Sequence, residues 1–265
     1  MLGHLLDEQA QNNRLSHVHP APKILVGIGS LILILIAPSP CIGVLSAGVL
    51  SFVILLVAQI PPRCYIRILM IPTGFTLMSV IVILLMTGGG EVYWQMHLLS
   101  WLELTITSRG IEECIIILSR VLGCTTSLLF ISLTTPLPDI ILVLQRFRVP
   151  GEITDLMMIL YRYIFILLDQ AMQIHTAQTM RLGYSRPREA TESFGMLCGA
   201  LFLSSWKSGD NLIQAMECRC YNGSFPTLSP HDPLKASSLL PALIFLTFLA
   251  CALLLVPPWP VPGVI

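Results

Sequence analysis

Two arginines, Arg181 and Arg219, are the side chains best suited to bind a partner. Each lies in a short element at the end of a proline-free, helix-length stretch, Met180 to Tyr184 in one case and Glu217 to Tyr221 in the other. A guanidinium group donates several hydrogen bonds in a fixed fork, which suits carboxylates and backbone carbonyls on another protein. A cation at a helix C-terminus is also favoured by the helix dipole, by about 0.3–1 kcal/mol. The two elements are therefore either docking points or stabilised helix ends.

Proline and glycine positions predict the helices that carry the first arginine. A short helix is expected over residues 140–147, and Val149 to Gly151 breaks it. A long helix then runs from Glu152 to Arg181, with Gly183 expected as its left-handed cap. A helix of about 30 residues is about 45 Å long.

A second long helix is expected from about Arg188 to about Arg219, ending near Asn222 and Gly223. Gly209 could divide it in two, because glycine lowers helix propensity. Gly195 and Gly199 form a small-residue pair that could let another helix approach closely. If the two long helices fold back on each other, the arginines lie a helix length apart. Two separated ends would suit two docking points, such as a pair of identical subunits.

The composition predicts an integral membrane protein. The chain has 265 residues, of which 54% are hydrophobic and only 11% are charged, and its mean hydropathy is +0.78. Soluble domains carry about 25% charged residues. Five apolar runs are candidate membrane spans: 24–37, 41–60, 66–86, 114–133 and 239–256. The first run reaches the required length of roughly 20 residues only with its flanking residues. The predicted fold class is an all-α membrane protein with about five transmembrane helices and two to three long coupling helices on the cytoplasmic side.

The distribution of lysine and arginine predicts the orientation of these spans. Basic residues gather in the N-terminal tail, in the connection over residues 60–67 and in the long segment from Thr134 to Ser238, whereas residues 88–113 carry four glutamates and one arginine. Cytoplasmic loops are enriched in lysine and arginine, so the N-terminus is expected to be cytoplasmic. The predicted divisions are a tail (1–22), a four-helix membrane bundle (23–135) with an outside loop (88–113), a cytoplasmic coupling-helix region (136–237) and a last transmembrane helix with the C-terminus (238–265).

The outside loop contains a segment of intermediate polarity, residues 91–110, with Trp94 and Trp101. Tryptophan favours the headgroup level of a membrane, so an interfacial helix is expected there. A lid that faces a ligand is the alternative.

No catalytic motif appears in the chain. It lacks a GxxxxGK[ST] phosphate loop, an HExxH zinc motif and a GxSxG nucleophile elbow. Within the apolar runs, Arg67 and Arg120 are the charged residues, whereas carriers coupled to ions usually need ionisable groups inside the membrane. Neither a catalytic residue nor a metal ligand is therefore assigned, and no nucleic-acid partner is expected. Metal binding by Cys218 and Cys220, or by His17 and His19, is the less favoured alternative.

Several segments resemble the membrane-embedded T component of energy-coupling-factor transporters, in the cobalt or nickel branch typified by CbiQ. The N-terminal segment from Ser16 to Lys23 is similar to that family's entry into its first helix. The denser matches are Thr134–Asp139, Arg148–Pro150, Leu160–Phe165, Ala177–Tyr184, Leu197–Phe202 and Gln214–Gly223.

The resemblance implies a non-catalytic transport subunit in the cytoplasmic or inner cell membrane. Its partners would be the lipid bilayer, two copies of a cytoplasmic ABC ATPase that bind ATP and Mg²⁺, and a small membrane subunit that binds cobalt or nickel, together with an accessory membrane subunit in some complexes. The chain itself would hold no cofactor. The residues that would dock the ATPases are Arg181, Gly183, Arg219 and Cys220. The residues of the structural coupling motif would be Pro136, Pro150, Tyr161, Arg162 and Tyr163.

The second element departs from the family pattern, because Cys220 stands where the family has glycine. Losing that glycine removes a favoured helix stop, so Asn222 and Gly223 would have to form the turn. Two alternatives remain at this point. One is a T component of a vitamin importer that works by the same mechanism. The other is an integral membrane enzyme that processes lipid, with residues 91–113 as its site.

Overall fold

The structure is a computed structural model that describes residues 13–15, 18–86, 92–99, 102–146, 149–221 and 236–255. It divides into two compact units. Unit 1 comprises residues 1–136 and 230–265, and unit 2 comprises residues 137–229. Except for one two-stranded sheet, the regular structure of the described residues is helical, which confirms the predicted helical membrane fold.

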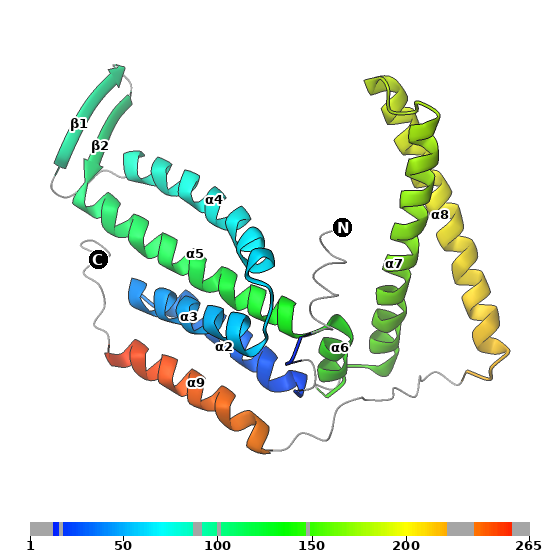
Figure 1. Cartoon of the computed structure of the whole chain (residues 1–265), viewed down its shortest axis with the longest axis horizontal. Coiled ribbons are helices and arrows are strands. Elements are labelled where there is room, and N and C mark those ends of the chain that lie inside the picture. Colours follow the sequence, from blue (N-terminus) through cyan, green and yellow to red (C-terminus); the bar gives the residue numbers. More distant parts are fainter. Residues whose placement is uncertain are drawn as a thin grey trace. The chain divides into compact units, whose positions relative to one another are not determined.

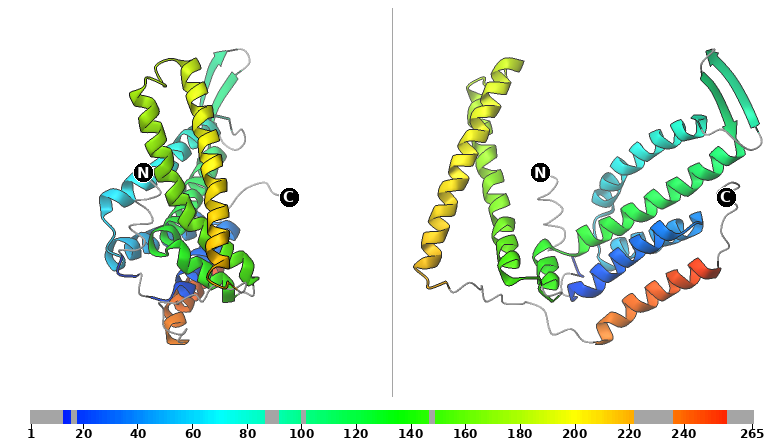
Figure 2. Two further views of the ribbon diagram at one scale, coloured as in Figure 1. Left: turned by 90° about the vertical axis from the view of Figure 1, so that its right-hand side faces the viewer. Right: turned by 180° about the vertical axis from the view of Figure 1, so that it is seen from behind.

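Unit 1 contains α2 (Pro20–Ile36), α3 (Pro40–Phe52), α4 (Pro62–Met86), α5 (Ser108–Thr134) and α9 (Ala236–Leu255). The π-helical turn Val53–Val57 continues α3. Helix α5 is central, because it contacts α2, α3 and α4, while α9 packs mainly against α2. The right-hand view in Figure 2 shows the same order of helices in unit 1.

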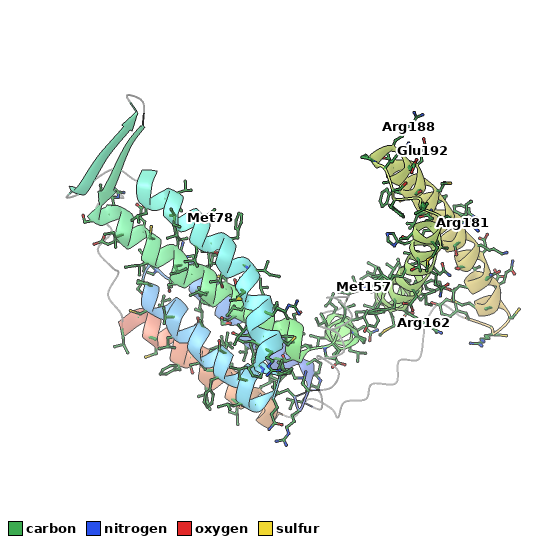
Figure 3. All side chains as sticks on the ribbon, turned by 45° about the horizontal axis from the view of Figure 1, so that its top comes forward. Met78, Met157, Arg162, Arg181, Arg188 and Glu192 are labelled. Atoms are coloured by element: carbon green, nitrogen blue, oxygen red, sulfur yellow. The ribbon has the colours of Figure 1, made fainter. Side chains whose placement is uncertain are left out.

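Three helical segments of the described chain are long and apolar enough to cross a membrane, namely Pro40–Val57, Pro62–Leu84 and Ser108–Thr134. Pro20–Ile36 and Leu239–Leu255 are shorter apolar helices. Helix α4 contacts α5 and leaves its other side bare, with Phe75 77% and Met78 71% exposed. Figure 3 shows Met78 on this bare side. Such a surface is suited to lipid.

Small residues bring α2, α3 and α5 close together. A Cβ atom added at Gly43 of α3 would lie 2.5 Å from both the backbone oxygen and the Oγ of Ser119. A Cβ at Gly123 would lie 3.0 Å from the Gly43 carbonyl oxygen. The hydroxyl groups of Ser30 and Ser127 are also hydrogen-bonded, 2.5 Å apart. Small residues therefore let these helix backbones approach closely, and serine hydroxyl groups bond across them, as in other membrane helix bundles.

The last carbonyl groups of α5 accept hydrogen bonds from the N-terminal segment. Asn13 Nδ2 donates to the Leu133 carbonyl at 2.9 Å, and Lys23 Nζ donates to the Thr134 carbonyl at 3.2 Å. Lys23 is only 4% exposed. The final carbonyls of a helix have no partner within it, so these two donors cap α5 from a distant part of the chain.

The segment expected to form an interfacial helix is instead an antiparallel hairpin of β1 (Val92–Leu99) and β2 (Leu102–Thr107). The prediction of a helix over residues 91–110 is therefore wrong. Leu102 to Thr107 alternates apolar and polar residues and is rich in β-branched types, which favours a strand. The tryptophans drew the prediction toward a membrane-surface helix, although the period of the pattern is two.

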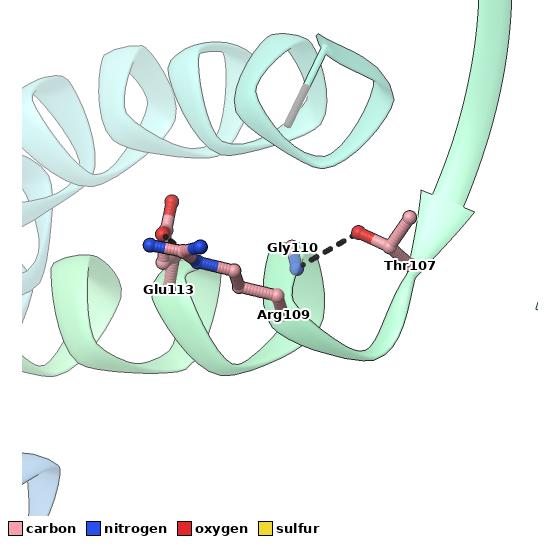
Figure 4. A network of polar contacts seen from close by, with 4 residues as sticks. All are labelled: Thr107, Arg109, Gly110 and Glu113. Atoms are coloured by element: carbon pink, nitrogen blue, oxygen red, sulfur yellow. Dashed lines mark hydrogen bonds and ion pairs between the residues drawn. The ribbon is translucent and has the colours of Figure 1, made fainter. Parts of the chain in front are cut away.

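Strand β2 leads directly into α5 (Figure 4). The Thr107 side chain caps this helix by accepting a hydrogen bond from the Gly110 amide at 3.2 Å. Arg109 and Glu113 form an ion pair of 3.3 Å one turn apart. The cap and the ion pair explain why the helix begins at Ser108, before the apolar run that was predicted to span.

Unit 2 contains α6 (Leu137–Arg146), α7 (Gly151–Met180) and α8 (Pro187–Glu217). These helices match the three that were predicted. Helix α8 passes through Gly209 without a break, so the alternative of a divided helix is wrong. A Cβ added at Gly195 or Gly199 would meet nothing within 4 Å. This pair is therefore not a packing face within unit 2.

Candidate functional site

Helices α7 and α8 form an antiparallel hairpin (Figure 1), and hydrogen bonds join its two arms at several points between its ends. Residues near the start of α7 contact residues near the end of α8, and residues near the end of α7 contact residues near the start of α8, as expected for antiparallel helices. Four of these hydrogen bonds are Tyr221 OH to Asp155 Oδ2 (3.5 Å), Tyr163 OH to the Ser208 carbonyl (3.5 Å), Ser204 Oγ to Gln170 Oε1 (2.9 Å) and Gln178 Nε2 to the Ser193 carbonyl (2.9 Å).

The hairpin places Arg181 and Arg219 at its opposite ends. Arg181 follows α7 at the turn, whereas Arg219 follows α8 close to the start of α7, because the neighbouring Tyr221 reaches Asp155. Twenty-six residues separate Asp155 from Arg181 (181 − 155), which corresponds to about 39 Å at 1.5 Å per residue. Both arginines are exposed. Figure 3 labels Arg181 on this hairpin.

The two helix ends have the same hydrogen-bond pattern. At the first end, the amides of Arg181, Leu182 and Gly183 donate to the carbonyls of Gln178, Thr179 and Gln178. At the second end, the amides of Arg219, Cys220 and Tyr221 donate to the carbonyls of Met216, Glu217 and Met216. In both cases the last of these bonds spans five residues, which defines a Schellman motif. Each arginine therefore occupies the C-cap position of the same motif.

The residue after each arginine adopts the left-handed conformation, with φ of 58° at Leu182 and 53° at Cys220. The prediction that Gly183 is the left-handed cap is therefore wrong by one residue. The prediction that the second helix turns at Asn222 and Gly223 is replaced by a turn at Cys220, and those two residues lie outside the described part of the chain. Neither helix end has glycine at the position that usually carries it.

Gly183 has a different role at the first end. A Cβ atom there would lie 2.6 Å from Ser193 Oγ, and this hydroxyl donates to the Gly183 carbonyl at 2.9 Å. Tyr184 OH donates to Gln178 Oε1 at 2.8 Å, and its ring lies 4.7 Å from that of His175. Close contact with α8 therefore requires glycine here and fixes the position of the first arginine element.

An open pocket of about 530 Å³ lies beside this element. Its walls include Arg181, Arg186, Glu189 and Glu192. Glu192 pairs with Arg188 at 3.5 Å, and Glu189 accepts a hydrogen bond from Ser185. These acidic groups therefore already have partners within the tip of the hairpin, and the Arg181 side chain, which also lines the pocket, is exposed.

The second element is joined to α7 through Tyr221. Burial and the carboxylate of Asp155 raise the pKa of the Tyr221 phenol, and Glu152 raises it further. The phenol therefore remains protonated at neutral pH and donates to Asp155, which is buried near the start of α7.

Five residues were predicted to form a coupling motif. Pro136 is the residue directly before unit 2, and the other four lie within unit 2. Pro136 lies between α5 and α6, and Pro150 is the N-cap of α7. The rings of Tyr161 and Phe165 pack edge to face at 5.2 Å, Tyr163 reaches Ser208, and Arg162 is exposed. The four of these residues that lie in unit 2 do not come together in one site.

Among the residues that the structure describes, the usual metal ligands do not gather in one place. In the part of the chain that the structure describes, no group of three or more His, Cys, Asp or Glu residues could hold a metal ion. His17 lies outside the described residues, whereas His19 caps α2 by accepting from the Ala21 amide at 3.2 Å. Cys218 and Cys220 are free and exposed.

Glycine at either left-handed position should stabilise its helix end. Left-handed backbone costs a non-glycine residue about 1–2 kcal/mol, and glycine loses about 0.5–1 kcal/mol more in backbone entropy. We expect Leu182→Gly to stabilise the end of α7 by about 0.5 kcal/mol, which amide hydrogen exchange at Gly183 and Tyr184 measures as slower opening. Ser185→Gly is the control and should not slow exchange. Faster exchange in Leu182→Gly would contradict the left-handed assignment.

Known proteins similar to this chain share its predicted family. The model of the cobalt transport protein family CbiQ matches residues 12–230. A putative fused cobalt transport protein CbiMQ of Methanocorpusculum labreanum is 36% identical over 252 residues, which cover 94% of this chain and 42% of that protein. The chain therefore spans less than half of this relative.

Two further relatives are covered almost completely. The cobalt transport protein CbiQ of Salmonella typhimurium is 28% identical over 233 residues, which cover 83% of this chain and 98% of that protein. The energy-coupling factor transporter transmembrane protein EcfT of Acidaminococcus fermentans is 28% identical over 270 residues, which cover 95% of each. With the family match extending over most of its length, the chain belongs to the CbiQ family of cobalt transport proteins.

Proposed function

We propose that this chain is the membrane-embedded coupling subunit of an energy-coupling-factor importer. In this role it transmits ATP hydrolysis by two cytoplasmic ATPase subunits to a small membrane subunit that binds the substrate. The observation that carries the proposal is the pair of matching helix ends, which display Arg181 and Arg219 at opposite ends of one hairpin, with about 39 Å of helix between Asp155 and Arg181. Two equivalent arginines that are separated in this way suit two similar acceptor sites. Relatives named CbiQ and EcfT support the same role.

The chain itself catalyses no reaction in this proposal. ATP and Mg²⁺ bind to the ATPase subunits, and the energy reaches this chain through contacts at its two arginines. The name of the fused relative joins CbiM and CbiQ in one protein. This supports a separate CbiM-like membrane subunit as the partner that binds the substrate here, with an accessory membrane subunit in some complexes.

The proposed substrate is cobalt, with nickel as the closest alternative, because the family and two of the relatives above are named for cobalt transport. Uptake of radioactive cobalt by cells that express the assembled complex tests this directly. Uptake of a vitamin in place of a metal would instead favour the EcfT-like alternative.

The proposed orientation follows the distribution of basic residues. The N-terminal tail (1–22) and the coupling-helix region (136–237) face the cytoplasm, and the loop over 88–113 lies outside the inner membrane. Unit 2 as a whole would then be available to cytoplasmic ATPases.

Recovery of the tagged chain from membranes tests the proposed function as a whole. We expect two ATPase copies and one small membrane subunit to co-purify with it. The control is the same chain with Arg181→Ala and Arg219→Ala, which should retain the small membrane subunit and lose ATPase. Recovery of the wild-type chain without any ATPase would contradict the proposal. It would instead direct attention to the lipid-enzyme alternative and the outside hairpin.

A further inference from the structure

The two arginine elements share one backbone but differ in the side chains that flank the arginine. Met180 and Leu182 flank Arg181 and are 82% and 73% exposed. Cys218 and Cys220 flank Arg219 and are also exposed. The matching hydrogen bonds make these positions equivalent pair by pair, Met180 to Cys218 and Leu182 to Cys220. The two ends therefore offer the same guanidinium geometry with different amounts of apolar surface.

Apolar area decides how tightly each end can bind. Burying one leucine or methionine side chain is worth more than tenfold in a binding constant. Cysteine carries a single sulfur atom beyond Cβ and buries much less surface. If both arginines enter similar grooves, the first element therefore binds through its guanidinium and two large side chains, whereas the second depends mainly on its guanidinium.

Negative charge near the second element also weakens its binding. Glu217 lies two residues before Arg219, and the negative charges of Asp155 and Glu152 act on the adjacent Tyr221. A groove that accepts arginine favours positive charge, so nearby carboxylates weaken its attraction. At the first element, Arg186 brings the basic residues that line the pocket to the same number as its two glutamates, so the surroundings of Arg181 carry no acidic excess.

We infer that the two docking ends are unequal, with the Met180–Leu182 end as the tight, permanent contact to one ATPase subunit and the Cys218–Cys220 end as the weaker, exchanging contact to the other. This inference rests on the proposed function. It assigns the flanking residues a role in how strongly each subunit is held, and it makes the chain an asymmetric partner even for two identical ATPases.

Charge reversal isolates each end for measurement. The full chain is reconstituted with the small membrane subunit that co-purifies with it. Binding of its own ATPase is then measured for Arg219→Glu, which leaves the first end, and for Arg181→Glu, which leaves the second. We expect the Arg219→Glu chain to bind ATPase at least about tenfold more tightly than the Arg181→Glu chain does. Equal affinities, or the reverse order, would overturn the inference.

Exchange of the flanking residues provides the matched control, because Leu182 and Cys220 have nearly the same backbone conformation, with φ of 58° and 53°. Adding Met180→Cys and Leu182→Cys to the Arg219→Glu chain should lower its affinity at least about tenfold. Adding Cys218→Met and Cys220→Leu to the Arg181→Glu chain should raise its affinity by a similar factor. If neither exchange changes the affinity, the flanking residues do not set the inequality and the inference fails.

The double charge reversal separates this inference from the proposed function. A chain with both Arg181→Glu and Arg219→Glu should not bind ATPase. Wild-type binding by this chain would refute docking through the arginines altogether. Lost binding in the double variant together with equal single variants would refute only the inequality.

Discussion

Substitution of both Arg181 and Arg219 by alanine is expected to abolish uptake by the assembled transporter. Arginine at the centre of an interface commonly contributes about 2 kcal/mol or more. Losing both should therefore weaken each ATPase contact roughly thirtyfold, and the binding of the ATPase pair as one unit roughly a thousandfold. Each single substitution should reduce uptake and the transport-coupled ATPase rate less than the double one. Cobalt uptake and ATPase activity in the same membrane vesicles are the measurements.

Arg188→Ala is the matched control for charge at the tip of the hairpin. Its side chain is 92% exposed and pairs with Glu192 in an i,i+4 contact, which contributes only about 0.3–0.5 kcal/mol to stability. We expect it to leave uptake and assembly unchanged. Full cobalt uptake by the double arginine variant, in a complex with normal subunit composition, would show that energy does not reach the chain through these residues.

Gly43→Ala is expected to destabilise unit 1 strongly, although it adds only one methyl group. The added Cβ would lie 2.5 Å from the Ser119 backbone oxygen, and backbone cannot rotate aside as a side chain can. Helices α3 and α5 must then separate. This separation also strains the hydrogen bond that Ser119 of α5 donates to the Pro40 carbonyl of α3. Overpacking of this kind typically costs about 1–3 kcal/mol, and we expect the upper part of this range, measured as a lower thermal midpoint of the chain in detergent.

Gly48→Ala on the same helix is its control, because a Cβ there would meet nothing within 4 Å. Alanine has a better helix propensity than glycine by about 0.8–1.0 kcal/mol. This variant should therefore be as stable as the wild type or slightly more stable. If the two substitutions had equal effects, the close approach of α3 to α5 at Gly43 would be refuted.

Local sequence signals were sufficient to predict the helices of unit 2. Pro150 and Gly151 mark the start of α7, Pro187 marks the start of α8, and the apolar stretches between them are long enough to exclude short elements. The placement of Arg181 and Arg219 at helix ends follows from the same signals. The packing of α8 against α7 could not be predicted from these local signals. The side chains that join the two helices are far apart in sequence, as Asp155 and Tyr221 are.

The wrong predictions fall where two local signals compete. At the end of α7, Gly183 is the obvious candidate for left-handed backbone, yet its small size is needed for contact with Ser193, and Leu182 takes the left-handed position. In the loop that was predicted to lie outside, Trp94 indicated a membrane-surface helix, whereas the alternation in β2 indicated a strand. In both places, the conformational preference of a single residue was outweighed by the residues around it.

The capping of α5 by Asn13 and Lys23 sets an order of events during biosynthesis. Lys23 is 111 residues from its acceptor at Thr134. At about 5–20 residues per second, the ribosome needs roughly 6–22 s to make that length of chain. Throughout this time the lysine has no α5 carbonyl to bind, and its ammonium group opposes burial. The segment that holds Asn13 and Lys23 therefore reaches its final position only after α5 has been made, although it is translated well before that helix.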